Sequence, residues 1–342
     1  MIFLFAYAIA VLQFPGLWSL RVVGNLLTDN SFIGIAAVGM TFVIIAGSID
    51  LSVGSIVALS AMAAASTSDQ LGILAIFNVR TIWELQDRDP DALKVEVYGQ
   101  QWWWEYRYDT NDDGKPDIIT ANQMVIPAGR QINLIIRSND VIHSFWIPAL
   151  NGKKDAVPGH IDKWLLEASK PGLYQGQCTE FCGLSHGKMK MEVKALSASD
   201  FDAWVANQQK GSVAPAAGSV AEAGQKLVQA RCLGCHQING FNDKGESTGS
   251  TLPDPDYRGA QHPLTAGNAP NLTHLMSRNK FAGNLFDLYT EDGQVNTSNL
   301  GNWLRNPKNL KPMAPDENRG MPNLNLSQDQ IDNLVAFLST LK

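Results

Sequence analysis

Charged side chains are almost absent from the beginning of this sequence. The 342-residue chain has 27 Lys and Arg and 33 Asp and Glu residues, but its first 79 residues include only Arg21, Asp29, Asp50 and Asp69. An apolar helix of roughly 20 residues is long enough to cross a bilayer. Residues 1–20 and 31–49 have no charge at all, so we expect residues 1–78 to form a multi-pass membrane anchor of transmembrane helices.

The first uncharged segment also lacks the features of a cleaved leader. A signal peptide begins with basic residues and ends at a small-residue cleavage site, and residues 1–20 show neither. We therefore interpret this segment as an anchor. Asp50 is interpreted as a break between two half-helices rather than as a functional carboxylate within the membrane. Lys and Arg are too sparse here for the positive-inside rule to orient the helices.

An excess of positive charge is missing from the whole chain. The net charge is −6, so no broad basic surface is expected, and a nucleic-acid partner is excluded on this ground. The length leaves room for two or three domains. A multidomain protein is therefore expected, with its soluble part beyond the uncharged segments.

Period-two alternation of apolar and polar residues begins after Asp87. It is clear at residues 93–97 and 131–137, and residues 102–108 are rich in aromatic side chains. Such runs, separated by clusters of Gly, Pro, Asn and Asp, favour an antiparallel β-sandwich of short strands, which we place at residues 79–207. Residues 197–208 are expected to form a short helix at its end.

A small all-α domain is predicted at the C-terminal end. Residues 208–220 contain Pro, Gly and Ser and almost no bulky apolar side chains, which is typical of a flexible linker. The runs EAGQKLVQARCLGCH and LSQDQIDNLVAFLSTL then place apolar residues three and four positions apart, as amphipathic helices do. We assign this domain to residues 221–342.

The chain has only four cysteines and six histidines, and their spacing is informative. The run QCTEFCGLSHGKM holds Cys178, Cys182, His186 and Met189, and His143 follows a predicted strand. Two thiolates, imidazoles and a thioether form a soft set of ligands that favours copper over zinc. A disulfide between the two cysteines is the alternative, but it leaves the His and Met residues without a purpose.

The second pair of cysteines lies in the run CLGCH. Two cysteines separated by two residues and followed by His are the attachment signature of c-type haem, with thioether bonds from Cys232 and Cys235 and with His236 as an axial ligand. The signature is short enough to occur by chance. It therefore needs a suitable context in the rest of the domain.

Residues 76–206 resemble the copper domain of cytochrome c oxidase subunit II, a cupredoxin β-sandwich. Four motifs carry the resemblance in the family's order: VEVYGQQWWWEYRY, SNDVIHSFWIPAL, KKDAVPGHIDKW and PGLYQGQCTEFCGLSHGKM. The resemblance implies a binuclear CuA centre held by the side chains of His143, Cys178, Cys182, His186 and Met189 and by the backbone carbonyl of Glu180. It also implies that the Glu180 carboxylate faces a magnesium ion at the contact with subunit I. Trp102 matches the family's electron-entry tryptophan, whereas Trp103 and Trp104 are expected to serve packing.

Residues 221–342 resemble a cytochrome c domain. The run APNLTHLMSR resembles the loop that places a proline, here Pro270, against the axial His. MPNLNLSQDQIDNLVAFLSTLK resembles the axial-Met loop and closing helix, which implies Met321 as the sixth iron ligand, with Met313 as the rival. His160, His262 and His274 lack a partner pattern and are expected to be surface or hydrogen-bonding groups.

Together these resemblances imply a haem c-fused subunit II of a respiratory haem–copper oxidase. Its partners would be subunit I, the other oxidase subunits, and a donor cytochrome or quinol-oxidising complex. The family places both soluble domains on the outer side of the cytoplasmic membrane. A membrane-tethered electron carrier without an oxidase partner is the alternative. Six histidines are too few for a nitrous oxide reductase, and a quinol oxidase subunit would lack the copper cysteines.

The beginning of the chain departs from this family. Residues 1–70, with the run NLLTDNSFIGIAAVGMTFVIIAGSIDLSVGS, instead resemble an early part of the permease subunits of sugar-type ABC transporters. Nothing after residue 80 continues that resemblance. Either a true fusion has replaced the family's two-helix hairpin, or two unrelated coding pieces were joined during sequence assembly. We favour the second, because loss of the hairpin would remove a large helix–helix contact.

Overall fold

The computed structural model describes residues 80, 89–114, 116–238, 269–317 and 319–342. The expected membrane anchor at residues 1–78 and the permease-like segment lie outside these residues. In the described part of the chain, no helix combines the length and the apolar character needed to cross a bilayer.

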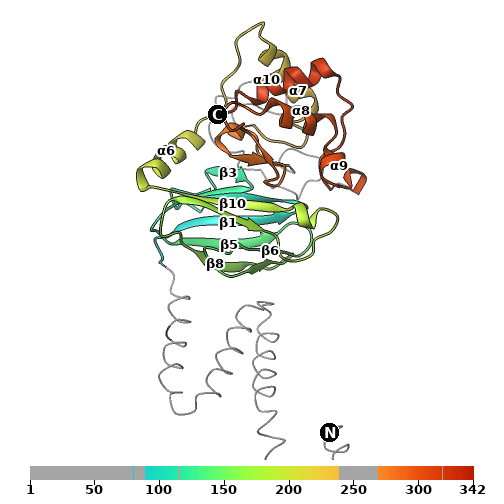
Figure 1. Cartoon of the computed structure of the whole chain (residues 1–342). Coiled ribbons are helices and arrows are strands. Elements are labelled where there is room, and N and C mark those ends of the chain that lie inside the picture. Colours follow the sequence, from blue (N-terminus) through green and yellow to red (C-terminus); the bar gives the residue numbers. More distant parts are fainter. Residues whose placement is uncertain (1–79, 81–88, 115, 239–268, 318) are drawn as a thin grey trace, which may run out of the picture. The chain divides into compact units, whose positions relative to one another are not determined.

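Five strands form the larger sheet, in the order β3-β2-β1-β5-β8 (Figure 1). They are β1 (Leu93–Gln100), β2 (Trp103–Asp109), β3 (Ile118–Ala121), β5 (Ile132–Ser138) and β8 (Asp162–Leu166). Along most of β1, buried and partly exposed residues alternate, because successive side chains of a strand point to opposite faces. β1 is the central strand, antiparallel to β2 and parallel to β5.

The smaller sheet has the order β4-β10-β9, and a separate hairpin pairs β6 with β7. Their bounds are β4 (Gln123–Pro127), β9 (Gly172–Gln177), β10 (Lys190–Leu196), β6 (His143–Phe145) and β7 (Lys154–Ala156). The expected β-sandwich is confirmed, but the expectation that it is antiparallel is wrong, since β1–β5 and β4–β10 are parallel pairs. Alternation reveals that a segment is a strand and not which strand lies beside it.

Both sheets contribute to one apolar core. Its largest fully buried side chains include Trp104, Tyr106 and Tyr108 of β2 and Met124 and Ile126 of β4. Trp104 has no exposed surface, and its ring meets Phe145 edge-on at 5.4 Å, so its expected role in packing is confirmed.

The expected short helix is also confirmed. It is α6 (Ala198–Gln208), and the Ser197 side chain caps its start by accepting a hydrogen bond from the Asp200 backbone N–H.

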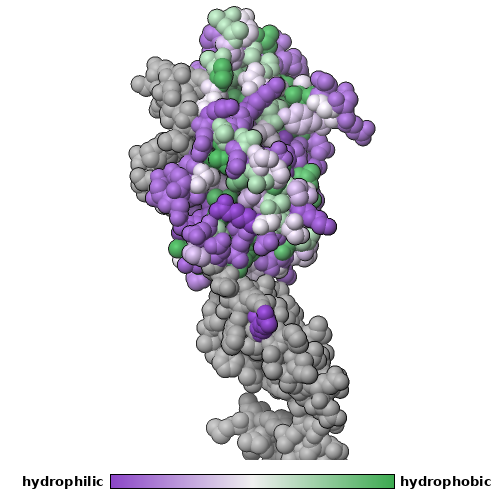
Figure 2. All heavy atoms as spheres, turned by 90° about the vertical axis from the view of Figure 1, so that its left-hand side faces the viewer, coloured by the Kyte–Doolittle hydropathy of each residue, from purple (hydrophilic) through white to green (hydrophobic). Residues whose placement is uncertain are grey.

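In Figure 2, the visible face of the described residues mixes hydrophilic and hydrophobic side chains without a continuous apolar area.

A second core lies in the C-terminal domain, whose described residues form four helices. They are α7 (Val220–Arg231), α8 (Thr297–Arg305), α9 (Pro307–Leu310) and α10 (Gln328–Leu338), with 3₁₀ turns η4 (Leu275–Ser277) and η5 (Pro315–Glu317). The helical domain is thus largely as predicted. The all-α expectation is wrong in one detail, because β11 (Lys280–Phe281) pairs with β12 (Phe286–Asp287) in a hairpin too short to show a sequence period.

The crossing of α7 and α10 depends on a glycine. A Cβ atom on Gly224 would collide with the backbone carbonyl oxygen of Asn333 and would lie 2.8 Å from the Cβ of Phe337. Phe337 is 1% exposed at the centre of this contact. The two helices can approach this closely only because Gly224 has no side chain.

We predict that Gly224→Ala destabilises the helical domain by about 1–3 kcal/mol, the usual cost of overfilling a packed core. At an exposed position of a helix, Gly→Ala would stabilise the fold by roughly 1 kcal/mol. The sign of the change in the free energy of unfolding therefore distinguishes tight packing from helix propensity. Unfolding of the full chain in urea, followed by the circular dichroism signal of its helices, measures this change in the free energy of unfolding. Lys226→Ala is the control, because Lys226 is exposed on the same helix and makes only a surface ion pair with Glu222. A Gly224→Ala protein as stable as the wild type would contradict the close helix crossing.

Candidate functional site

The first pair of cysteines lies on a loop of residues 178–189, the cysteine loop, which connects β9 to β10. The two strands pair up to Gln177 and Lys190, and the Cys178 N–H then donates to the Met189 carbonyl at 3.0 Å. The loop is therefore closed at its base, and its second half turns through the 3₁₀ element η2 (His186–Lys188). This geometry brings residues eleven positions apart in the sequence side by side.

The sulfur atoms of this loop form a compact cluster. The Sγ atoms of Cys178 and Cys182 lie 3.9 Å apart, and neither cysteine is in a disulfide. The Sγ of Cys182 lies 3.8 Å from the Sδ of Met189 and 3.5 Å from Nδ1 of His186. Both cysteines and the methionine are buried. The alternative interpretation, a disulfide between these two cysteines, is therefore not found in the structure.

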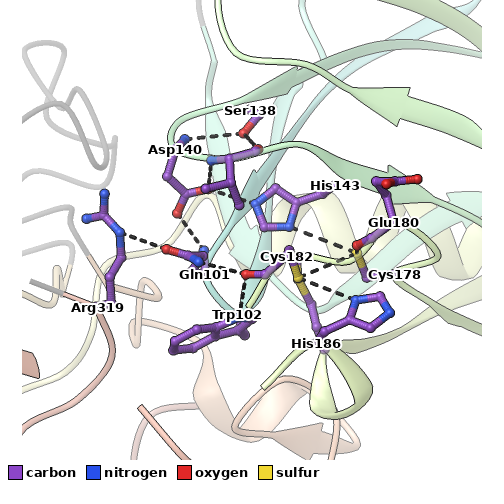
Figure 3. A network of polar contacts seen from close by, with 12 residues as sticks. Gln101, Trp102, Ser138, Asp140, His143, Cys178, Glu180, Cys182, His186 and Arg319 are labelled. Carbon is purple, nitrogen blue, oxygen red and sulfur yellow. Dashed lines mark hydrogen bonds and ion pairs between the residues drawn. The ribbon is translucent and has the colours of Figure 1, made fainter. Parts of the chain in front are cut away.

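His143 of β6 reaches the cluster from the adjacent hairpin (Figure 3). Its Nδ1 lies 4.0 Å from the Sγ of Cys178, and its Nε2 lies 2.7 Å from Oδ1 of Asp140. The ring is fully buried, and the Asp140 side chain is only 5% exposed. Asp140 therefore fixes which ring nitrogen faces the sulfur atoms.

Proton equilibria at the cluster reflect these contacts. The hydrogen bond between the two thiols lowers the pKa of Cys178 to about 4, and the same contact raises the pKa of Cys182. Burial acts to lower the pKa of His143, but its hydrogen bonds to Asp140 and Cys178 outweigh burial and the pKa is raised. A thiolate is thus available in the cluster at neutral pH, as metal binding requires.

The Cys182 carbonyl accepts two hydrogen bonds from the turn between β1 and β2. Nε2 of Gln101 donates to it at 2.7 Å and Nε1 of Trp102 at 2.9 Å. The Gln101 backbone N–H also donates to Asp140 at 2.7 Å. The Trp102 side chain, which is 3% exposed, therefore lies directly against the cysteine loop.

The donor set of this cluster fits copper. Cys178, Cys182, His143, His186 and Met189 converge on one buried volume, and the first three already have their ligand atoms within 4.8 Å of one another. Two thiolates with imidazole and thioether ligands are soft donors that suit copper. The backbone carbonyl oxygen of Glu180 lies 3.3 Å from the Sγ of Cys178. The Glu180 carboxylate points away from the sulfur atoms (Figure 3).

The second pair of cysteines follows α7 in the helical domain. His236 lies beyond the helix end, and its Nδ1 lies 2.7 Å from the carbonyl oxygen of Pro270. This contact leaves Nε2 as the free ring nitrogen. Burial lowers the pKa of His236, which favours the neutral imidazole that iron binds. Cys232 and Cys235 are free thiols.

A cavity of about 310 Å³ opens beside these residues. Its lining includes Cys232, Cys235, His236, Pro270, Met313 and Met321. Arg278 also lines it, is 4% exposed, and has an Nε atom without a hydrogen-bond partner among the described residues. Nη2 of Arg278 donates to the Asn271 carbonyl at 2.5 Å. An apolar cavity with two thiols, one imidazole and a buried guanidinium that has a free Nε suits a haem with its anionic propionates.

The two methionines lie next to each other in this cavity. The Met321 backbone N–H donates to the Sδ of Met313 at 3.4 Å, and a Cβ on Gly320 would collide with the Met313 side chain. Met313 is buried, and Met321 is partly buried. Both thioethers therefore remain candidates for the axial position.

Several residues at these sites were not singled out from the sequence. Asp140 could have been found, since it precedes His143 by three residues in the same motif. Gln101 adjoins Trp102 but has no ligand chemistry of its own, and Arg278 lies in the quoted run APNLTHLMSR without a distinguishing pattern. His274 is a hydrogen-bonding group as expected, between the carbonyls of Lys210 and Lys342, whereas His262 lies outside the described residues.

Two family models match the sequence of this chain. The family model described as cytochrome c oxidase subunit II, periplasmic domain, matches residues 110–196, and the cytochrome c model matches residues 221–342. A solved structure of the periplasmic domain of subunit II of cytochrome oxidase from Bradyrhizobium japonicum is 30% identical. The match covers 35% of the present chain and 96% of the Bradyrhizobium japonicum chain, with a TM-score of 0.33.

Two bacterial relatives match much more of the chain. Cytochrome c oxidase subunit 2 of Alkalihalophilus pseudofirmus is 32% identical over 284 residues, which are 80% of this chain and 70% of the relative. The same subunit of Bacillus sp. strain PS3 is 31% identical over 289 residues, which are 79% of this chain and 70% of the relative. The chain therefore belongs to the cytochrome c oxidase subunit 2 family.

Proposed function

We propose that this chain is the haem c-containing subunit II of a haem–copper cytochrome c oxidase. It would pass electrons from haem c to a binuclear CuA centre and on to haem a of subunit I during aerobic respiration. The observation that carries the proposal is the presence, in one chain, of a Cys–Cys–His–His–Met cluster and a cavity of about 310 Å³ lined by Cys232, Cys235 and His236. Oxygen reduction itself belongs to subunit I.

The CuA ligands in this proposal are the residues that converge at the cysteine loop. They are His143, Cys178, Cys182, His186 and Met189, with the backbone carbonyl of Glu180. When bound, the copper pair supplies a one-electron redox centre. The chain's own contribution is rigidity: Asp140 orients His143, while Gln101 and Trp102 hold the Cys182 carbonyl. A rigid ligand set reorganises little between redox states.

The haem ligands in this proposal lie in the helical domain. Cys232 and Cys235 would form the thioether bonds, and His236 would bind iron through the ring nitrogen that Pro270 leaves free. Met321 is assigned as the sixth ligand, with Met313 as its rival. The Arg278 guanidinium would offset the charge of a propionate in the buried cavity.

An oxidase subunit I is the proposed partner of the cysteine loop. Two large apolar side chains on the loop are exposed, Phe181 at 76% and Leu184 at 66%. Exposed apolar residues beside a redox centre are suited to a protein contact. Glu180, next to Phe181, would present its carboxylate to a magnesium ion at the same contact.

Electron entry is proposed to occur at haem c rather than at the copper centre. Trp102, the proposed entry tryptophan, is 3% exposed in the folded chain, so a separate donor protein cannot touch it. A donor cytochrome or a quinol-oxidising complex would therefore deliver electrons to haem c. The soluble domains would face the outer side of the cytoplasmic membrane, where haem attachment and CuA assembly take place in this family.

A membrane-tethered electron carrier without an oxidase partner is the second candidate, favoured by the unusual N-terminal sequence. Co-purification distinguishes the two. A copper- and haem-loaded chain that never associates with a subunit I would contradict the oxidase proposal.

Cys182→Ser is predicted to abolish the near-infrared absorption of CuA and to leave the haem c spectrum unchanged. Serine would remove one of the two thiolate sulfur atoms that would hold copper, and it leaves the helical domain unaltered. Absorption spectra of the purified full chain measure both signals at once. Loss of both signals would show that the copper and haem sites are not independent.

Met321→Ala is predicted to remove the sulfur-to-iron charge-transfer band of oxidised haem c, because alanine cannot occupy the sixth position. Met313→Ala is the matched comparison, since both methionines line the same cavity. If Met313→Ala alone removes the band, the axial assignment goes to Met313.

Asp140→Asn is predicted to lower copper affinity by about 10- to 100-fold, the usual effect of losing the partner that orients a metal-binding His. Copper retained after dialysis against a graded chelator measures the change. Asp202→Asn, at an exposed position on α6, is the control. Equal copper retention in both variants would show that Asp140 does not orient His143.

A further inference from the structure

Three consecutive residues of the helical domain bind the β-sandwich domain. The carbonyl of Leu310 accepts a hydrogen bond from Nζ of Lys188 at 2.7 Å, and the carbonyl of Pro312 accepts one from Oγ of Ser185 at 2.5 Å. Ser185 and Lys188 flank His186 on the cysteine loop. Residues 310–313, the contact segment, therefore lie along the loop that would hold copper, and the segment ends at Met313 of the haem cavity.

Lys311 is the central residue of this segment. Its Nζ donates to the Trp102 carbonyl at 2.6 Å and to the Ala282 carbonyl at 3.1 Å. Only 3% of Lys311 is exposed, which is rare for a lysine. The side chain thus joins the electron-entry tryptophan to two separate segments of the helical domain, its own and the turn after β11.

Gly283 gives Lys311 the space it needs. A Cβ on Gly283 would collide with Nζ of Lys311 and would lie 3.1 Å from the carbonyl oxygens of Lys188 and Trp102. The Gly283 carbonyl in turn accepts a hydrogen bond from the Lys190 backbone N–H at 3.0 Å. The turn therefore lies against the cysteine loop as closely as backbone atoms allow.

A second bridge ends at the proposed copper ligand itself. Nε of Arg319, two residues before Met321, donates to Oε1 of Gln101 at 2.8 Å (Figure 3). The amide nitrogen of Gln101 then donates to the Cys182 carbonyl at 2.7 Å. The Arg319 side chain and the backbone of the cysteine loop are thus connected through a single glutamine.

We propose that Lys311 is a positioning residue for internal electron transfer, which locks the axial-methionine side of the haem cavity onto the cysteine loop. The lock consists of the contact segment, Gly283 and the Arg319–Gln101 bridge. It fixes the distance between the two cofactors and adds to polar contacts elsewhere between the domains, from Gln208 to Ser277 at 3.1 Å and from Asn279 to Glu192 at 3.1 Å. The inference rests on the proposed function, since it concerns transfer between the two proposed redox sites.

Lys311→Met in the full chain, loaded with copper and haem c, tests the lock. Methionine keeps the length and removes both hydrogen bonds, and losing such buried bonds shifts a docking equilibrium by roughly tenfold. We expect the electron-transfer rate from photoreduced haem c to CuA to fall by about that factor. Hydrogen exchange of peptides 183–190 and 310–317 should rise in parallel, whereas the CuA and haem spectra should stay as in the wild type.

Lys308→Met is the matched control, because Lys308 is exposed three residues earlier. Gly283→Ala is the second variant, and Gly293→Ala is its control, since both glycines have φ of +78° but only Gly283 has neighbours that a Cβ would meet. Gly283→Ala should slow transfer and Gly293→Ala should not. If both Lys311→Met and Gly283→Ala kept the electron-transfer rate and the hydrogen exchange of the wild type, the proposed lock would be overturned but the proposed function would not. A wild-type chain without any transfer from haem c to copper would overturn the proposed function as well.

Discussion

Two sulfur atoms must stay close together without forming a bond, and much of the structure serves this constraint. The Sγ atoms of Cys178 and Cys182 are 3.9 Å apart, whereas a disulfide would bring them to about 2 Å. The pairing of β9 with β10 fixes the first cysteine, because Cys178 begins the loop where the ladder ends. The second is fixed through its carbonyl, which two side chains from the β1–β2 turn hold. The backbone, rather than the sulfur atoms, therefore determines the spacing in which a copper pair would fit.

The same turn serves the helical domain. Gln101 and Trp102 offer their side-chain N–H groups to the cysteine loop and an oxygen each to Arg319 and Lys311. Any displacement of the helical domain is thus transmitted to the Cys182 carbonyl through one short segment. Stability does not explain the choice of Lys311, because burial lowers its pKa to about 7 and an apolar side chain would be less costly there. A buried amine with directed hydrogen bonds instead specifies one relative position of the two domains.

The sequence was sufficient for the elements and the ligands that have local patterns. Alternation located β1 and β5, and the helix expected at residues 197–208 is α6, which Ser197 caps. The capping box of Ser327 and Gln330 starts α10 where the amphipathic pattern begins. Cysteine and histidine spacing located the cluster because four of its ligands lie on one loop, and His143 was added because it follows a predicted strand. The parallel pairs of the sandwich could not be predicted, since strand pairing depends on contacts between segments distant in the sequence. Lys311 could not be predicted for the same reason: it lies 209 residues from the carbonyl that it binds.

The cysteine loop has two faces, and they differ in what covers them. Ser185 and Lys188 are engaged by the contact segment of the same chain, whereas Phe181 and Leu184 remain exposed. The exposed ring of Phe181 also meets the His186 ring at 5.7 Å, so this proposed ligand is reached from the open face as well. The proposed copper centre would therefore have one face toward its proposed donor and another open to a partner, which would give electrons separate routes for entry and exit. Fusing the proposed donor to the chain would therefore not compete with the proposed contact to subunit I, because the two contacts would use different residues of one twelve-residue loop.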